Sequence, residues 1–177
     1  VNHNGDINLA YKLIDAAHRA GADGIKFQTY VTEELIARGT AKAPYQEARG
    51  GGEDQFQMLK RLELSFDAFK KLKAYADAKG MLFVSTPFDE KSFAFLSTLD
   101  MPFWKIPSGE ITNYLFLMAA GQTGKPVVLS TGMSTLDEVS AAIKTLQEHG
   151  NRDLTLLHCT TAYPTPLSEV NLRSMTT

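Results

Sequence analysis

Two lysines stand inside runs of residues that otherwise have the composition of buried β-strands. Lys26 lies in the run GIKFQTY (24–30), and Lys105 follows a tryptophan in the run 102–107. An ammonium buried without a partner is costly, so each lysine needs an anion nearby. One lysine alone could extend to solvent or pair with an internal acid, but two lysines accompanied by hydroxyl groups favour a site for a phosphate or carboxylate ligand.

Small hydroxyl residues follow the same strand-like runs. Those that could donate hydrogen bonds to the anion are Thr86, Ser108, Ser130 and Thr131. Gln28 alternates with Lys26 and therefore shares its face of the strand. Glu110 could accept a hydrogen bond from a sugar hydroxyl or help to move a proton, or it could be an acid favoured at a helix N-terminus.

The chain has four histidines and one cysteine. His18 and His149 fall in helical segments and are expected at the surface, whereas His3 and His158 lie near strand ends and could reach the site. The spacing of the histidines does not specify metal binding, so a structural role is favoured for each and no complete metal site can be built. For Cys159, which cannot form a disulfide within the chain, we favour a small buried residue over a reactive thiol.

Five β-rich runs carry these side chains, and helical segments separate them. Apolar residues recur at three- and four-residue steps between the runs, and a glycine stands where each helix should end. Four of the runs begin roughly 20 to 30 residues apart, the spacing of successive strand and helix units in a parallel sheet. The runs are residues 24–30, 81–87, 102–107, 126–132 and 154–160, and the helix-ending glycines are Gly21, Gly80, Gly124 and Gly150.

Polar residues at the carboxyl ends of several strands are typical of an active site in a (β/α)8 TIM barrel. No Gly-x-Gly-x-x-Gly follows the first run, which weakens the case for a doubly wound dinucleotide-binding sheet. Since a barrel takes about 250 residues, we expect residues 1–177 to be a partial barrel domain, an α/β fragment with about five of eight strands. The first strand would lie upstream and the last two downstream. We expect Val31 to Asp54 to form a poorly packed loop with short helical pieces near the same rim.

The overall charge of the chain is too close to zero to hold nucleic acid or an anionic membrane by electrostatic attraction alone. Lysines and arginines number 18 against 20 acidic residues, for a net charge of −2. We therefore expect no nucleic-acid partner and no membrane partner. The sequence shows no signal segment and no long apolar span, and with its single cysteine it is expected to be cytoplasmic.

Six motifs also occur in the order found in one known family. Together they resemble the sialic acid synthase family, the bacterial N-acetylneuraminate synthases and their legionaminic and pseudaminic acid relatives. The motifs are NHNGD (2–6), GIKFQT (24–29), STPFD (85–89), WKIPSGE (104–110), LSTGM (129–133), and LHCT (157–160) with Tyr163-Pro164.

The resemblance implies a (β/α)8 barrel that condenses phosphoenolpyruvate with the open-chain aldehyde of an N-acetylated amino sugar. The acceptor would be N-acetylmannosamine or a diacetamido relative, and the products a nine-carbon 2-keto acid and phosphate. By motif match, Gln28, Glu110 and Tyr163 would face the sugar, and Lys26, Lys105 and Glu110 would be the catalytic residues. The residues expected to hold phosphoenolpyruvate are Lys26, Thr86, Lys105, Ser108, Ser130 and Thr161. Thr161 stands where family members often have Asn, and it has a shorter reach and no amide donor.

The resemblance further implies a divalent metal, Mn²⁺ or Mg²⁺, whose ligands would lie outside this chain. It also implies a small antifreeze-like C-terminal domain and a homodimer, and the chain alone is expected to be inactive. Two other functions stay open. One is a class I aldolase that forms a Schiff base through Lys105, and the other is a barrel that only binds an anionic ligand.

Overall fold

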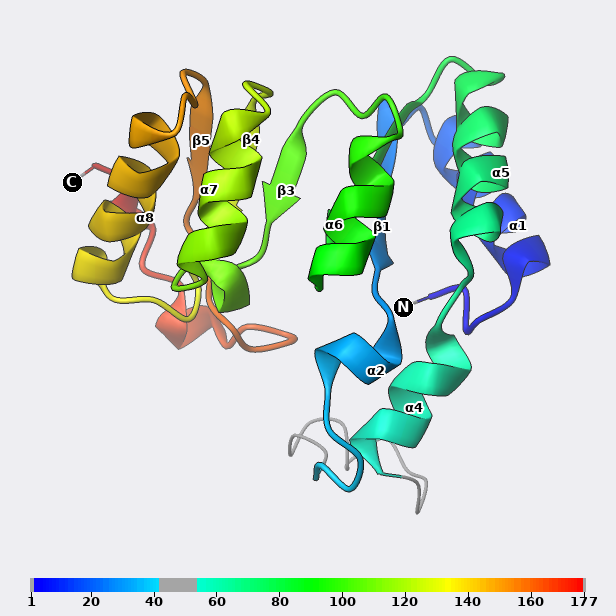
Figure 1. Cartoon of the computed structure of the whole chain (residues 1–177), viewed down its shortest axis with the longest axis horizontal. Coiled ribbons are helices and arrows are strands. Elements are labelled where there is room, and N and C mark those ends of the chain that lie inside the picture. Colours follow the sequence, from blue (N-terminus) through cyan, green and yellow to red (C-terminus); the bar gives the residue numbers. More distant parts are fainter. Residues whose placement is uncertain (1, 42–53, 177) are drawn as a thin grey trace. The chain divides into compact units, whose positions relative to one another are not determined.

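The computed structural model describes residues 2–41 and 54–176, which belong to two compact units, Val1–Met101 and Pro102–Thr177. Each unit contains a parallel β-sheet with helices beside it (Figure 1). Every helix within the described ranges is too short or too polar to cross a membrane.

Unit 1 is built on a pair of parallel strands. β1 (Gly24–Thr29) pairs with β2 (Leu82–Pro87) in a register that sets Gly24 opposite Leu82 and Thr29 opposite Pro87. The helices that precede, connect and follow these strands are α1 (Ile7–Arg19), α2 (Thr32–Leu35), α4 (Gln55–Leu62), α5 (Phe66–Asp77) and α6 (Glu90–Ser97).

Helices α1 and α5 lie side by side in unit 1 (Figure 1). Ile14 of α1 and Leu72 of α5 are completely buried, because the apolar residues of both helices recur at helical spacing and form one face. Phe69 of α5 reaches the sheet, where its ring meets Phe27 of β1 edge to face with centroids 6.4 Å apart. This aromatic contact fixes one face of β1 against the helical layer.

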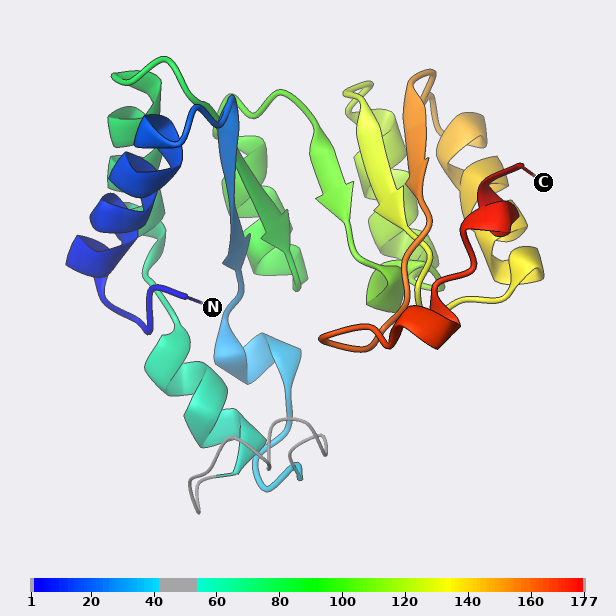
Figure 2. The same ribbon diagram turned by 180° about the vertical axis from the view of Figure 1, so that it is seen from behind.

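Unit 2 has a sheet of three parallel strands in the order β3 (Trp104–Ile106), β4 (Val127–Ser130), β5 (Leu154–Leu157). Figures 1 and 2, seen from opposite sides, show α7 (Tyr114–Gln122) and α8 (Leu136–Glu148) together on one face of this sheet. Three short 3₁₀ segments of the described chain complete the unit: η1 (Ser108–Glu110), η2 (Leu167–Glu169) and η3 (Leu172–Thr176).

One face of the unit 2 sheet is fully apolar. Trp104 and Ile106 on β3 lie in register with Val127 and Leu129 on β4, and each is at most 2% exposed. Side chains alternate along a strand, so Lys105 and its partner Val128 point to the other face of the sheet. Lys105 is therefore directed away from the buried side that Trp104 and Ile106 occupy.

The five predicted strand positions are confirmed, and the pairing within each sheet is parallel. The four glycines expected at helix ends all have positive φ, the conformation that a helix C-terminus favours. The α/β class with parallel strands is thus established, whereas closure of the strands into a barrel stays a prediction. Part of the predicted loop, residues 42–53, lies outside the described residues.

Candidate functional site

Lys26, Gln28 and Thr86 share one face of the β1–β2 pair. In the parallel register Lys26 lies opposite Val84, and Gln28 lies opposite Thr86. Side chains alternate along a strand, so these residues point to the same side of the sheet. The structure thus brings three of the predicted site residues together, with Gln28 and Thr86 near the carboxyl ends of their strands.

The other face of this strand pair is a packed core. The rings of Phe27 and Phe83 stack with their centroids 5.6 Å apart. The hydroxyls of Thr29 and Ser85 share a hydrogen bond of 2.7 Å, and both residues are completely buried. The polar side chains on this face are therefore satisfied by the fold itself.

Among the described residues, Thr86 and Lys26 have no such compensation. Thr86 is 2% exposed, and within the described part of the chain its hydroxyl oxygen has no hydrogen-bond partner. Solvent reaches the Lys26 side chain, yet enough protein surrounds its ammonium that desolvation lowers the pKa of Lys26 below its ordinary value. An anion between them would accept from the hydroxyl and favour the charged lysine, which relieves both costs.

A cavity of about 440 Å³ lies beside β1, and Lys26, Gln28 and His3 contribute to its lining. His3 is 3% exposed, and its Nδ1 accepts a hydrogen bond of 3.1 Å from the Gly5 backbone N–H. The neutral ring therefore carries its proton on Nε2, which has no partner among the described residues. Burial lowers the pKa of His3 and favours this neutral form. His3 thus lies beside the lysine-bearing strand, as the sequence suggested it could.

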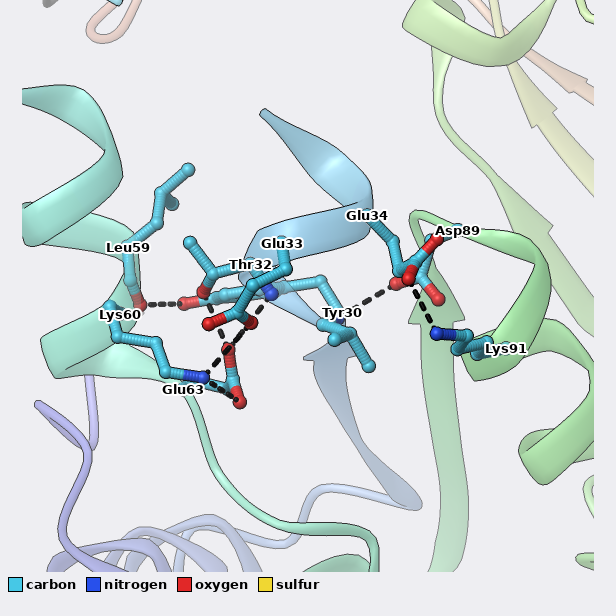
Figure 3. Close-up of polar contacts among 10 residues, drawn as sticks. Tyr30, Thr32, Glu33, Glu34, Leu59, Lys60, Glu63, Asp89 and Lys91 are labelled. Atoms are coloured by element: carbon cyan, nitrogen blue, oxygen red, sulfur yellow. Dashed lines mark hydrogen bonds and ion pairs between the residues drawn. The ribbon is translucent and has the colours of Figure 1, made fainter. Parts of the chain in front are cut away.

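The segment that follows β1 is anchored on both sides (Figure 3). The Tyr30 hydroxyl donates to a backbone carbonyl of α4 at 3.0 Å, and burial raises the pKa of Tyr30 to about 12. Glu63 Oε2 accepts from the backbone N–H and the hydroxyl of Thr32, at 2.8 and 2.5 Å. On the other side of α2, Asp89 accepts from the backbone N–H of Val31 at 2.8 Å.

These contacts correct one expectation. We predicted a poorly packed loop from Val31 onward, and the expected short helical piece is present as α2, but its first residue, Thr32, is completely buried. Ion pairs of Lys60 with Glu33 and Glu63 reinforce the anchor, but they are largely exposed and therefore worth little. The burial of Thr32 was not foreseen because its partner Glu63 lies 31 residues away in the sequence, whereas the other described residues from 31 to 41 are exposed or half-buried, as expected.

In unit 2, Lys105 and Ser130 are in direct contact. Lys105 Nζ donates to Ser130 Oγ at 2.6 Å and to the carbonyl of Ile106 at 2.8 Å. Lys105 lies opposite Val128, two residues before Ser130, so both side chains share the face opposite the apolar layer. A cation and a hydroxyl from neighbouring strands thus meet at the carboxyl end of the sheet.

Ser108 and Glu110 lie immediately beyond β3, in η1, and both are half-buried. Glu110 Oε2 accepts a hydrogen bond of 2.7 Å from the Asn113 side-chain amide, and the Asn113 side-chain oxygen caps α7. Glu110 is therefore in the short 3₁₀ segment ahead of α7 rather than in the first turn of that helix.

Thr161 lies against the turn that follows β4. A Cβ at Gly132 would come within 2.8 Å of the Thr161 hydroxyl, so this approach requires glycine. Tyr163 is 69% exposed and lines a cavity of about 310 Å³ together with His158 and Cys159. Cys159 is half-buried rather than fully buried as expected.

The predicted site residues therefore divide between the two units. Unit 1 carries Lys26, Gln28 and Thr86, and unit 2 carries Lys105, Ser108, Glu110, Ser130, Thr161 and Tyr163. The contact between Lys105 and Ser130 and the shared face of Gln28 and Thr86 lie within single units. That Lys26 and Lys105 bind one anion is a statement across the units and stays a prediction.

Two carboxylates near the site, Asp89 and Glu63, had no predicted role. Asp89 is the N-cap of α6, and its carboxylate accepts from the Ser92 backbone N–H. Aspartate is a preferred N-cap residue, so this capping role could have been predicted from an aspartate directly ahead of an apolar helical segment. Its contact with Val31 and that of Glu63 with Thr32 leave no local pattern in the sequence.

The metal that the resemblance implies does not fit the residues described here. Nowhere in residues 2–41 and 54–176 do three histidine, cysteine or acidic side chains gather in a way that could hold an ion.

The sequence is similar to those of known enzymes. The chain is 46% identical to the N,N'-diacetyllegionaminic acid synthase of Campylobacter jejuni over 178 residues, which cover 99% of this chain and 53% of that protein. It is 43% identical to the enzyme of the same name from Legionella pneumophila, covering 100% of this chain and 51% of that one. The chain thus spans about half the length of these curated relatives.

A solved structure agrees with the sequence relatives. The N-acetylneuraminic acid synthetase of Leptospira borgpetersenii, crystallised in complex with citrate, superimposes with a TM-score of 0.85 at 32% identity, over 99% of this chain and 56% of that one. The model of the NeuB family matches residues 13–177, nearly the whole sequence. The chain therefore belongs to the NeuB family.

Proposed function

We propose that the protein carrying this chain condenses phosphoenolpyruvate with the open-chain aldehyde of an N-acetylated amino sugar. The products would be a nine-carbon 2-keto acid and inorganic phosphate. Since the two curated relatives described above are diacetyllegionaminic acid synthases, we favour a diacetamido sugar over N-acetylmannosamine as the acceptor. The complete protein would be cytoplasmic, act as a homodimer and serve carbohydrate biosynthesis.

One observation carries the proposal: each unit presents a lysine and a hydroxyl on the same face of its parallel sheet. In unit 1 these are Lys26 and the Thr86 hydroxyl, which has no hydrogen-bond partner among the described residues. In unit 2 they are Lys105 and Ser130. Phosphoenolpyruvate carries a phosphate and a carboxylate, so two cations with adjacent hydroxyl donors match its charge and its acceptors.

The residues of this chain would act mainly by positioning. Lys26 and Lys105 would neutralise phosphate and carboxylate, and Thr86, Ser108, Ser130 and Thr161 would donate to their oxygens. With phosphoenolpyruvate held in this way, its C3 would face the aldehyde carbon and form the new carbon–carbon bond. Water would then add to C2, and phosphate would leave as the ketone forms.

The sugar side of the site would be formed by Gln28, Glu110 and Tyr163. The Gln28 amide can both donate to and accept from sugar hydroxyls, and the Glu110 carboxylate can accept from them. Tyr163 is mostly exposed and offers a ring and a hydroxyl. Mn²⁺ or Mg²⁺, which the family resemblance implies, would need ligands outside the described residues.

The decisive experiment measures phosphate release from phosphoenolpyruvate by the complete protein, with a diacetamido sugar, with N-acetylmannosamine and with no sugar. Release that depends on a sugar supports the synthase. Borohydride reduction in the presence of pyruvate, followed by mass measurement, tests the alternative, because a lysine-linked adduct would indicate a class I aldolase. Binding of phosphoenolpyruvate without turnover would indicate a barrel that only binds its ligand.

A further inference from the structure

The Asp89 carboxylate joins the ends of two strands. Asp89 is 9% exposed, and its Oδ1 accepts from the Ser92 backbone N–H at 2.8 Å. Its Oδ2 accepts from the Ser92 hydroxyl at 2.7 Å and from the Val31 backbone N–H at 2.8 Å. Capping α6 uses only the first of these contacts, so the second oxygen serves another element.

The bridge lies directly beyond the carboxyl ends of β1 and β2. The last hydrogen bond between the strands runs from the Phe88 N–H to the Thr29 carbonyl, at 3.1 Å. Val31 lies two residues beyond Thr29, the last residue of β1. At this level the neighbouring strand β2 has already ended, and α6 begins at Glu90. The Asp89 carboxylate therefore extends the ladder by one charge-assisted hydrogen bond past the end of the sheet.

We propose that Asp89 is a positioning residue for the phosphoenolpyruvate site. By holding Val31 to the start of α6, it fixes the relative positions of Gln28 and Thr86, which are register partners next to the bridge. This inference rests on the proposed function. Asp89 is one of the residues that hold the anchored segment of Figure 3, and its role is to act through the strand ends rather than to touch substrate.

If Asp89 only capped α6, a serine at position 89 would serve equally well. Serine is as good an N-cap as aspartate, so Asp89→Ser keeps an oxygen for the Ser92 N–H. A serine has one oxygen on a shorter side chain, so the Val31 N–H loses its acceptor. Capping and bridging are thus separable by one substitution.

The test measures steady-state kinetics of the complete protein with phosphoenolpyruvate as the varied substrate. We expect Asp89→Ser to raise KM for phosphoenolpyruvate about tenfold, short of the roughly hundredfold cost that misplacement by about 1 Å can reach. Ser92→Ala, which removes one hydrogen bond to Asp89 and leaves the bridge, should stay within about twofold of wild type. Asp6→Ala, which removes the N-cap of α1, controls for lost stability alone.

Amide hydrogen exchange at Val31 gives a second readout. Exchange should become faster in Asp89→Ser and stay at the wild-type rate in Ser92→Ala and Asp6→Ala. If Asp89→Ser does not fold, Asp89→Asn is measured in the same way, because the amide cannot accept from both backbone donors.

Three outcomes are distinct. A wild-type KM for phosphoenolpyruvate in Asp89→Ser, or an equal rise in Asp6→Ala, overturns the positioning role. A wild-type protein that neither binds nor consumes phosphoenolpyruvate overturns the proposed function instead. A selective rise in KM together with faster Val31 exchange supports the proposal.

Discussion

Replacing Thr86 by Val should make the protein more stable and weaken its binding of phosphoenolpyruvate. The two side chains have nearly the same shape, and the substitution exchanges a hydroxyl for a methyl at a site that is 2% exposed. Burying a hydroxyl without a partner costs about 1–3 kcal/mol in proteins. The Thr86 hydroxyl has no partner among the described residues, so we expect the free energy of unfolding to rise by about 1–2 kcal/mol, or about 2–4 °C in Tm for each kcal/mol.

The same hydroxyl would donate to an anionic ligand. A hydrogen bond to a charged group is worth about 1.5–3 kcal/mol, so Thr86→Val should weaken phosphoenolpyruvate binding by about tenfold to a hundredfold. Calorimetric titration measures the affinity, and chemical denaturation measures the free energy of unfolding. Thr29→Val is the matched control on the opposite face of the same strand pair. It leaves the Ser85 hydroxyl buried and unpaired, and so should destabilise the fold while phosphoenolpyruvate affinity is retained.

The two variants should change the free energy of unfolding in opposite directions, and only Thr86→Val should weaken the binding of phosphoenolpyruvate. A Thr86→Val protein that is less stable than wild type would show that the hydroxyl already has a partner in the folded state. Unchanged affinity for phosphoenolpyruvate in Thr86→Val would remove this hydroxyl from the anion site.

Three further predictions concern titratable groups. Lys105→Met should lower phosphate release from phosphoenolpyruvate at least about tenfold, and a borohydride-trapped pyruvate adduct that disappears in this variant would instead favour the aldolase. Because burial lowers the folded-state pKa of Lys26, the unfolded chain holds that proton to higher pH. Wild-type stability should therefore rise between the lowered pKa and 10.5, and Lys26→Met should lack this rise in denaturation measured from pH 7 to 11. For His3, whose folded-state pKa is also lowered, stability should fall as pH drops below 6.5, and a flat profile in His3→Gln would assign the loss to this ring.

The strands and helix ends were predictable from the sequence because they depend on local chemistry. A β-branched or aromatic run fixes each strand, and Gly21 or Gly80 ends a helix in a conformation that other residues avoid. The alternation of Lys26 with Phe27 and Gln28 also follows from the strand period alone. Each of these inferences needs only a window of a few residues.

Contacts between distant segments were not predictable in this way. The hydrogen bond of Thr32 with Glu63 and that of Val31 with Asp89 join residues 31 and 58 positions apart. Which polar groups are satisfied depends on these pairings. The sequence could therefore name Thr86 as a hydroxyl of the site, but it could not show that this hydroxyl lacks a partner in the part of the chain that the structure describes. The loop after β1 was expected to be loosely packed for the same reason.

The two faces of the β1–β2 pair differ in a way that locates function without reference to any family. On one face, the hydroxyls of Thr29 and Ser85 share a hydrogen bond and the rings of Phe27 and Phe83 stack. Each of these side chains therefore contributes to the stability of the fold. On the other face, Lys26, whose pKa is lowered, shares the strand surface with the buried Thr86 hydroxyl, which no residue of the described ranges partners. Selection for stability alone would replace the buried Thr86 hydroxyl with an apolar side chain of similar shape. One kind of ligand, an anion, would compensate both the lowered pKa of Lys26 and the buried Thr86 hydroxyl. Ligand binding therefore explains the two features more simply than two independent defects in folding do. The anion that relieves both costs is therefore expected on this face, and the satisfied face serves as the rigid support that holds it in place.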